Sequence, residues 1–160
     1  MSLDSVRQFF ALNAPDIPVI VTEKSSATVA LAAEAHGVAP EQIAKTLCAR
    51  VGDRVILVVM AGTARLDNRK FKDLFGVKPR MLDAEEVVAL TSHPVGGVCP
   101  FGLPQPLPVY CDLSLKPFEQ VVPAAGAINA AVHIAPERLA ALTQAEWADL
   151  TQPPKADAEA

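Results

Sequence analysis

The chain has 160 residues, of which 51% are hydrophobic and 20% are charged, and its formal net charge is −4. This length suits one domain with its own core, and the composition excludes an intrinsically disordered protein. The longest apolar run, at 55–62, is too short to cross a bilayer, and the N-terminus lacks the basic and apolar blocks of a signal peptide. We therefore expect one cytoplasmic domain over residues 1–150, without membrane contact, followed by a flexible tail over residues 151–160.

The first part of the chain predicts two helices. Apolar residues at helical spacing predict a helix at 2–12 with Ser2 as its N-cap. A short strand is expected at 17–22. Small and apolar residues then predict a helix at 26–36 that ends at Gly37, a residue suited to the left-handed position after a helix.

A β-hairpin is expected next. Two apolar segments, 45–51 and 54–61, are separated by Gly52-Asp53, and a two-residue loop with glycine first is typical of a type II′ turn. The second segment is apolar on both faces. It should therefore lie inside a sheet that is covered on each side.

The rest of the chain mixes short helices and strands. Asp67 and Asp83 suit the N-caps of helices that end at Phe75 and Leu90. Further strands are expected at 78–81, 107–111, 120–122, 130–134 and 146–150, and a further helix at 136–142. Because the order is not a strict βαβ alternation, it favours an α+β fold with a mixed sheet and helices packed around it.

The cysteines and histidines limit the metal and redox chemistry. Cys48, Cys99 and Cys111 are odd in number and lack CxxC spacing, so they predict neither a disulfide framework nor a zinc site. The three histidines are scattered along the chain. We expect no metal ion and no cofactor.

Positive charge is concentrated in one segment. Residues 65–80 hold six basic and two acidic side chains, whereas residues 81–160 hold three basic and ten acidic ones. Such a cluster can attract a polyanion, although it is also typical of a solvated helix face.

Lys45 is one candidate for chemistry. It lies where a helical turn enters the first hairpin strand. Its ammonium either extends to solvent along an apolar stem or faces a cleft, where it would provide a fixed positive charge for a phosphate or a carbonyl oxygen.

The segment from His93 to Pro108 is rich in proline and glycine. Gly96-Gly97 allows the backbone to approach a ligand closely, and Pro94 and Pro100 would hold its amides in place. The same pair of glycines could also form a turn that binds nothing.

Several motifs occur together in a fixed order. They are Glu41-Gln42-Ile43-Ala44-Lys45-Thr46-Leu47, Arg65-Leu66-Asp67, Leu90-Thr91, Gly96-Gly97-Val98-Cys99-Pro100, Pro108-Val109-Tyr110-Cys111-Asp112, Ala125-Gly126 and Leu142-Thr143. In this order they resemble the YbaK/ProX family of aminoacyl-tRNA deacylases. The resemblance runs from about Ser25 to Leu150, and the same fold occurs as the editing domain of bacterial prolyl-tRNA synthetases.

The resemblance implies a free-standing enzyme that hydrolyses the ester between a wrong amino acid and the terminal adenosine of a tRNA. The implied fold is a curved mixed sheet, partly barrel-like, surrounded by helices. The family's lysine falls on Lys45, which would hold the acceptor end. Its glycine loop falls on Gly96 to Pro100, and the amides of Gly96, Gly97 and Val98 would place the scissile carbonyl without a side-chain nucleophile.

The resemblance also implies an acyl pocket and a tRNA-binding surface. Ala124 stands where the cysteine-specific branch tends to have serine, which favours the branches that remove alanine or other small residues. The implied substrate-contacting residues are Ser25, Ser26, Thr28, Thr46, Cys99, Pro100, Asp112, Ala125 and Gly126. The implied tRNA-contacting residues are Arg65, Arg69, Lys70 and Lys72.

We therefore expect deacylation of tRNA for proline that carries alanine, cysteine or another small amino acid, with tRNA and, transiently, prolyl-tRNA synthetase as partners. One alternative is a non-catalytic domain that binds tRNA or a synthetase. Another is a thiol hydrolase built on Cys99 and His93, although a buried, structural Cys99 is the favoured interpretation. Asp112 could likewise be a helix cap rather than a substrate contact.

Overall fold

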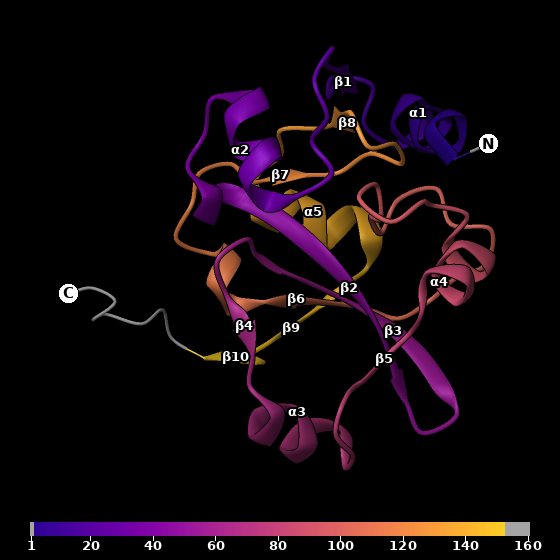
Figure 1. Cartoon of the computed structure of the whole chain (residues 1–160), viewed down its shortest axis with the longest axis vertical. Helices are drawn as coiled ribbons and strands as arrows, with labels where there is room; N and C mark the ends of the chain where they lie inside the picture. The colour runs from indigo at the N-terminus through magenta and orange to yellow at the C-terminus, as the bar shows by residue number, and fades with distance from the viewer. Residues whose placement is uncertain (1, 153–160) are drawn as a thin grey trace.

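A six-stranded mixed sheet runs through the centre of the molecule (Figure 1). The structure, a computed structural model, describes residues 2–152. The strands follow the order β5-β2-β3-β6-β9, with β7 also paired to β2. Their bounds are β2 (Ile43–Val51), β3 (Arg54–Ala61), β5 (Arg80–Met81), β6 (Val109–Asp112), β7 (Val122–Pro123) and β9 (Glu146–Ala148). The expected single α+β domain is confirmed, but its sheet is open and not closed into a barrel.

β2 and β3 form the expected hairpin. Their antiparallel register pairs Val51 with Arg54 and leaves Gly52-Asp53 as the loop. Gly52 has a φ of 63°, whereas Asp53 is not among the residues with positive φ, which is the type II′ pattern. β3 pairs with β2 on one side and β6 on the other, and residues 56–60 are 0% exposed, so β3 is the interior strand that its apolar sequence predicted.

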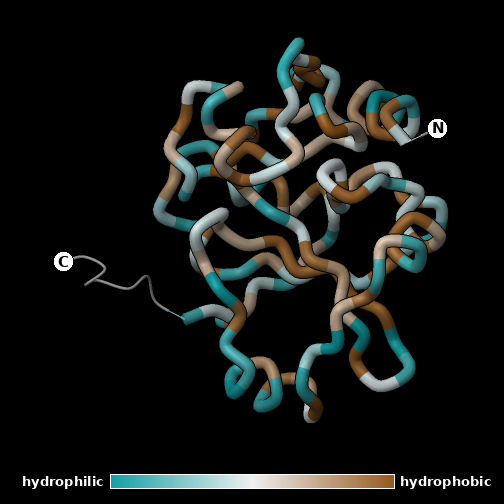
Figure 2. The backbone as a smooth tube through the Cα atoms, viewed as in Figure 1, coloured by the Kyte–Doolittle hydropathy of each residue, from teal (hydrophilic) through white to brown (hydrophobic). Residues whose placement is uncertain are grey.

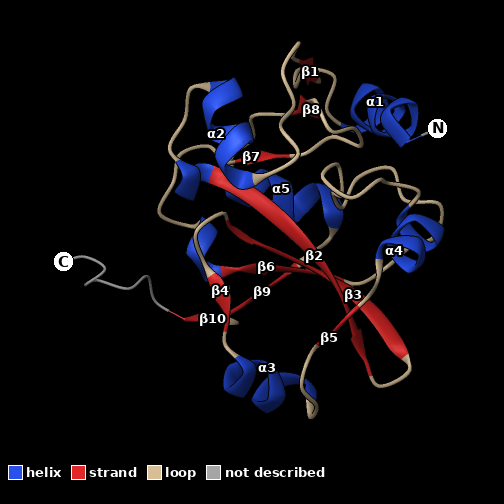
Figure 3. Cartoon of the chain, viewed as in Figure 1, coloured by secondary structure: helices blue, strands red, loops and turns tan. Residues whose placement is uncertain are grey.

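Five α-helices and two 3-10 turns surround the sheet within residues 2–152 (Figure 3). They are α1 (Ser2–Asn13), α2 (Val29–His36), η1 (Pro40–Gln42), α3 (Asn68–Phe75), α4 (Ala84–Thr91), η2 (Leu113–Leu115) and α5 (Pro136–Thr143). Asp67 and Asp83 cap α3 and α4 as predicted. The predicted start of α2 at Ser26 is wrong, because Thr28 is the N-cap and the Ser26 N–H donates to the carbonyl of Ile128.

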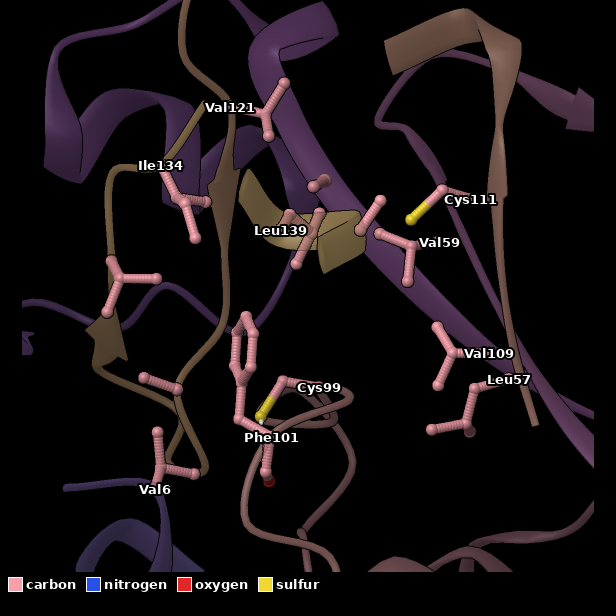
Figure 4. Close-up of a cluster of buried hydrophobic side chains, with 14 of the residues drawn as sticks. Val6, Leu57, Val59, Cys99, Phe101, Val109, Cys111, Val121, Ile134 and Leu139 are labelled. Carbon is pink, nitrogen blue, oxygen red and sulfur yellow. Dashed lines mark hydrogen bonds between the residues drawn. The ribbon is translucent and has the colours of Figure 1, made fainter. Parts of the chain in front are cut away.

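The side chains of β2 alternate between two apolar layers. Ala44 and Cys48 belong to the larger cluster, which includes residues of α1, α5 and the loop around Phe101 (Figure 4). Ala49 and Val51 belong to the cluster on the other face, which includes residues of α3. Figure 2 shows hydrophobic colour along the backbone that crosses the middle of the fold.

Several strands are shorter than predicted, among them β1 (Ile20–Val21) and β8 (Ala130–Ala131), which pair with each other. β4 (Arg65–Leu66) and β10 (Thr151–Gln152), which also pair, were not predicted. The placement of residues 151 and 152 in a flexible tail is therefore wrong, because both are paired. The remainder of the expected tail lies outside the described residues.

Each helix within residues 2–152 falls short of the length and apolarity needed to cross a membrane.

Candidate active site

The outer edge of β2 is only partly covered. β7 pairs with β2 at residues 43 and 44, and β5 pairs with it at residues 49 and 50. Both neighbours lie on the edge that faces away from β3, so this edge stays open over residues 45–47. A cavity of about 280 Å³ lies along the open stretch, between α2, the start of α4 and the glycine loop.

Lys45 borders this cavity. The alternation of β2 directs its side chain toward the face that α3 covers, and Nζ donates to the carbonyl of Ala64 at 2.7 Å. Burial, and then the charge of Arg65, lower the pKa of Lys45. Because an ammonium has three donors, the bond to Ala64 leaves capacity for an anion. Lys45 and Arg65 thus form a cationic patch beside the cavity.

The glycine loop is a tight turn held against two other segments. The Gly97 N–H donates to the carbonyl of Pro94 at 2.8 Å, and Gly96 has a φ of 91°, as the third residue of a type II turn requires. The carbonyl of Gly97 accepts from the Gly126 N–H at 3.0 Å. The Gly97 amide is therefore not available to a substrate carbonyl, which corrects its predicted role. Within residues 2–152, the amides of Gly96 and Val98 have no backbone partner.

The predicted hydroxyl residues of the pocket have structural hydrogen bonds. Ser26 Oγ donates to the carbonyl of Ile128, Ser25 Oγ accepts from the Ala27 N–H, and Thr28 Oγ1 accepts at the start of α2. Ser26 and Thr28 line the cavity, whereas Ser25 is not part of its wall. These residues shape the entrance to α2, and Thr28 keeps a hydroxyl proton to donate.

Thr46 lies in the middle of the open stretch and lines the cavity, as predicted for a substrate contact. Its Oγ1 is buried and has no hydrogen-bond partner in the described part of the chain. An unpaired buried hydroxyl costs about 1–3 kcal/mol. A bound polar group would remove that cost.

Cys99 and His93 lie together but away from the cavity. Both are 0% exposed, and Cys99 Sγ lies 3.5 Å from His93 Nε2. His93 Nε2–H donates to the carbonyl of Phe101 at 2.8 Å, while Nδ1 faces Ser2 Oγ. Burial raises the pKa of Cys99 to about 12. Figure 4 shows Cys99 beside Phe101 among apolar side chains, so the structure supports a structural Cys99 and not the thiol-hydrolase alternative.

Four other predicted substrate contacts also lie outside the cavity wall. Asp112 is 0% exposed, and its carboxylate accepts hydrogen bonds from the amides of Ser114 and Leu150 and from the Thr151 hydroxyl. It is a cap that ties β6 to the C-terminal segment. The remaining three, Pro100, Ala125 and Gly126, are buried, and the Gly126 N–H holds the loop by donating to the carbonyl of Gly97.

The predicted tRNA-contacting residues lie on β4 and α3. Arg65, Arg69 and Lys72 are exposed. Lys70 donates to the Asp149 carboxylate at 2.9 Å and to the carbonyl of Thr151 at 2.8 Å, so its amine is largely occupied. Figure 1 shows α3 at the opposite end of the molecule from α2.

Apart from Val98 and Ala124, the apolar walls of the cavity were missing from the sequence predictions. Val29 and Ala32 come from α2, Leu82 follows β5, and Ala124 and Ala131 come from the β7 and β8 region. The three-residue spacing of Val29 and Ala32 was a readable signal for one helix face. No group of three or more potential metal ligands occurs among the residues that the structure describes.

Comparisons with known proteins give the same family as the motifs. The model of the aminoacyl-tRNA editing domain matches residues 23–142. The Bacillus subtilis (strain 168) protein YwhH, itself uncharacterized, is 47% identical over 152 residues, which are 94% of this chain and 97% of YwhH. EbsC of Enterococcus faecalis (strain ATCC 700802 / V583), named for a proposed Cys-tRNA(Pro)/Cys-tRNA(Cys) deacylase activity, is 29% identical over 122 residues, 74% of each chain.

A solved structure shows the same fold at higher identity than EbsC. It is the crystal structure of a proposed trans-editing enzyme for prolyl-tRNA synthetase, which superposes with a TM-score of 0.88 at 33% identity. The match covers 95% of this chain and 98% of that one. The chain belongs to the aminoacyl-tRNA editing domain family.

Proposed function

We propose that this protein is a trans-editing hydrolase that removes a wrongly attached small amino acid from tRNA. The substrate class is tRNA for proline that carries alanine, cysteine or another small amino acid. The observation that carries the proposal is the cavity of about 280 Å³, with mainly apolar walls, beside Lys45 and the amides of Gly96 and Val98. A pocket of this kind suits a small acyl side chain held by a few polar groups.

A second site that hydrolyses errors has a physical reason. One methylene in a synthetase pocket separates similar side chains by only about 1–3 kcal/mol, which is less discrimination than translation requires. A small editing pocket that hydrolyses the ester of the smaller, wrongly attached amino acid supplies the missing discrimination.

The reaction needs one water and no covalent intermediate. The water oxygen bonds to the ester carbonyl carbon, the bond from that carbon to the ribose oxygen breaks, and one water proton passes to the ribose oxygen. The free amino acid leaves as a carboxylate after it loses the other proton. The amides of Gly96 and Val98, which have no backbone partner among the described residues, can hold the carbonyl oxygen as negative charge develops there. The ribose hydroxyl beside the ester is the substrate's own group for orienting the water.

The tRNA would follow the positive charges that begin at the cavity. Lys45 and Arg65 suit the terminal phosphate, and exposed Arg69 and Lys72 on α3 extend the path toward the acceptor stem. Binding of this kind weakens as salt rises. Cytoplasmic location and transient contact with prolyl-tRNA synthetase, where such errors arise, belong to the same proposal.

A deacylation panel tests the function. Wild type and Lys45→Ala are compared on Ala-, Ser-, Cys- and 2-aminobutyryl-tRNA for proline, with exposed Lys116→Ala as the matched control. We expect wild type and the control to hydrolyse at least one substrate, and Lys45→Ala to be about 100-fold slower, as for loss of one electrostatic contact at a reacting centre. Hydrolysis by Lys45→Ala at the wild-type rate would show that Lys45 has no role in the reaction. Salt-sensitive tRNA binding without turnover would instead support the non-catalytic alternative.

A further inference from the structure

We propose that the aminoacyl group binds to the open edge of β2 as a one-residue strand, paired with the main chain of Thr46. This proposal rests on the deacylase function above and adds how the cavity recognises an α-amino ester. The recognition comes from backbone groups, so it serves every acyl side chain that fits the cavity.

The register of the sheet fixes the direction of the Thr46 main chain. Leu57, which is opposite Cys48, donates its N–H to the carbonyl of Pro108 at 2.9 Å, away from β2. Cys48 therefore directs its N–H and C=O away from β3, and its carbonyl accepts from the Leu82 N–H at 3.5 Å. Main-chain direction repeats every second residue of a strand. The N–H and C=O of Thr46 therefore also point outward in the plane of the sheet.

The positions on either side of Thr46 are already covered. Ala44 pairs with β7, and the Cys48 carbonyl accepts a hydrogen bond from the Leu82 N–H. Ala44 and Cys48 are about 13 Å apart along β2, at roughly 3.3 Å per residue. Leu82 and Ala124, the residue after β7, both line the cavity. No segment within residues 2–152 pairs with Thr46 on this edge. The cavity thus occupies the place where one more strand residue would lie.

An aminoacyl ester carries the two groups that this place requires. Its α-amino group can donate to the Thr46 carbonyl, and its ester carbonyl can accept from the Thr46 N–H, as in the addition of a strand to a sheet edge. A carbonyl oxygen has two lone pairs, so an amide of Gly96 or Val98 can donate to the same oxygen. Loss of the Thr46 N–H should therefore slow hydrolysis for every accepted amino acid.

Thr46→Pro removes this N–H without removing a β2–β3 hydrogen bond. Proline is tolerated on an edge strand where its missing N–H faces away from the ladder. Leu47→Pro is the matched control, because the Leu47 N–H points toward β3, and it should unfold the hairpin. Thr46→Val is the second comparison, since it keeps the N–H and removes only the hydroxyl. Thermal unfolding and circular dichroism establish which variants are folded.

Single-turnover deacylation of the best wild-type substrate is the readout. We expect Thr46→Pro to be about 100-fold slower than wild type, the loss typical of one oxyanion donor, and Thr46→Val to lose less. A folded Thr46→Pro that is as fast as Thr46→Val would overturn the proposal and leave the deacylase function intact. A wild type without turnover on the whole panel would overturn the deacylase function itself.

A second measurement needs no variant. The outward Thr46 amide should exchange hydrogen quickly in the free protein, whereas the Leu47 amide, which pairs with β3, should be protected. A hydrolysis-resistant 3′-aminoacylamino-3′-deoxyadenosine should slow exchange at Thr46. Saturable binding of this analogue without slower exchange at Thr46 would overturn the proposal even where Thr46→Pro fails to fold.

Discussion

The open edge of β2 and the loop around Cys99 both carry groups that could do chemistry, but they differ in access. Cys99 and His93 are 0% exposed, and each has a hydrogen-bond partner within the loop. Thr46 borders a cavity, and its hydroxyl has no partner in the described residues. In this protein the unpaired groups at an accessible edge mark the candidate site, whereas the more reactive residue types belong to the core.

Among substitutions that test this difference between the two regions, we expect one in the glycine loop to have the largest effect. A Cβ at Gly97 would lie 2.7 Å from the Ala127 nitrogen, a backbone atom that cannot move aside cheaply. We expect Gly97→Ala to lower the free energy of unfolding by about 1–3 kcal/mol and to reduce deacylation by displacing the loop. Urea unfolding and single-turnover rates are the measurements.

Gly37→Ala is the matched control for that substitution. Gly37 has a positive φ, at 65°, which Gly97 does not, and a Cβ there meets nothing within 4 Å. We expect a loss of about 1 kcal/mol from backbone strain alone, with deacylation retained. Equal losses of activity in the two variants would show that the loop contact does not matter for the site.

Cys99→Ala should affect stability and not catalysis. It removes a buried sulfur from the large cluster, which we expect to cost about 1 kcal/mol of unfolding free energy. Native Cys99 should also resist alkylation, because burial raises its pKa to about 12. If a folded Cys99→Ala variant loses deacylation, the thiol of Cys99 is the reactive group and the thiol-hydrolase alternative is correct.

The smallest expected effect concerns pH. Burial, and then the charge of His133, lower the pKa of His36 below its ordinary value near 6.5. The unfolded chain therefore binds this proton more readily than the folded one, so stability should fall as pH falls below about 6.5. His93, whose pKa burial also lowers, contributes in the same direction.

His36→Gln should flatten part of this dependence. The urea midpoints of wild type and His36→Gln are compared at pH 7.5 and 5.5. We expect a smaller decrease in the variant, because glutamine does not titrate. An equal decrease in both proteins would assign the acid sensitivity to other groups.

The sequence predicted the parts of the fold that local chemistry decides. The caps at Asp67 and Asp83 and the turn at Gly52-Asp53 depend on neighbouring residues alone, and the structure has all three. The ends of the short strands were predicted less well, because distant partners decide where pairing stops. Thr151 and Gln152 pair with β4, and nothing in their own sequence indicates that partner.

The site shows the same limit. Lys45 and the glycine loop were found because their residue types are informative, and Thr46 followed from the family motif. The outward direction of the Thr46 amide depends on which strand covers each edge of β2. The engaged amide of Gly97 depends on the Pro94 carbonyl in the folded turn. Neither property belongs to a residue type, so neither could be predicted from the sequence.

The most direct test of the account is a crystal structure with a hydrolysis-resistant 3′-aminoacylamino-3′-deoxyadenosine. The account predicts that the aminoacyl group lies in the cavity, against Thr46 and the amides of Gly96 and Val98, with the adenosine toward Lys45. An aminoacyl group bound in the groove between Phe75 and Trp147, or against Cys99, would contradict it.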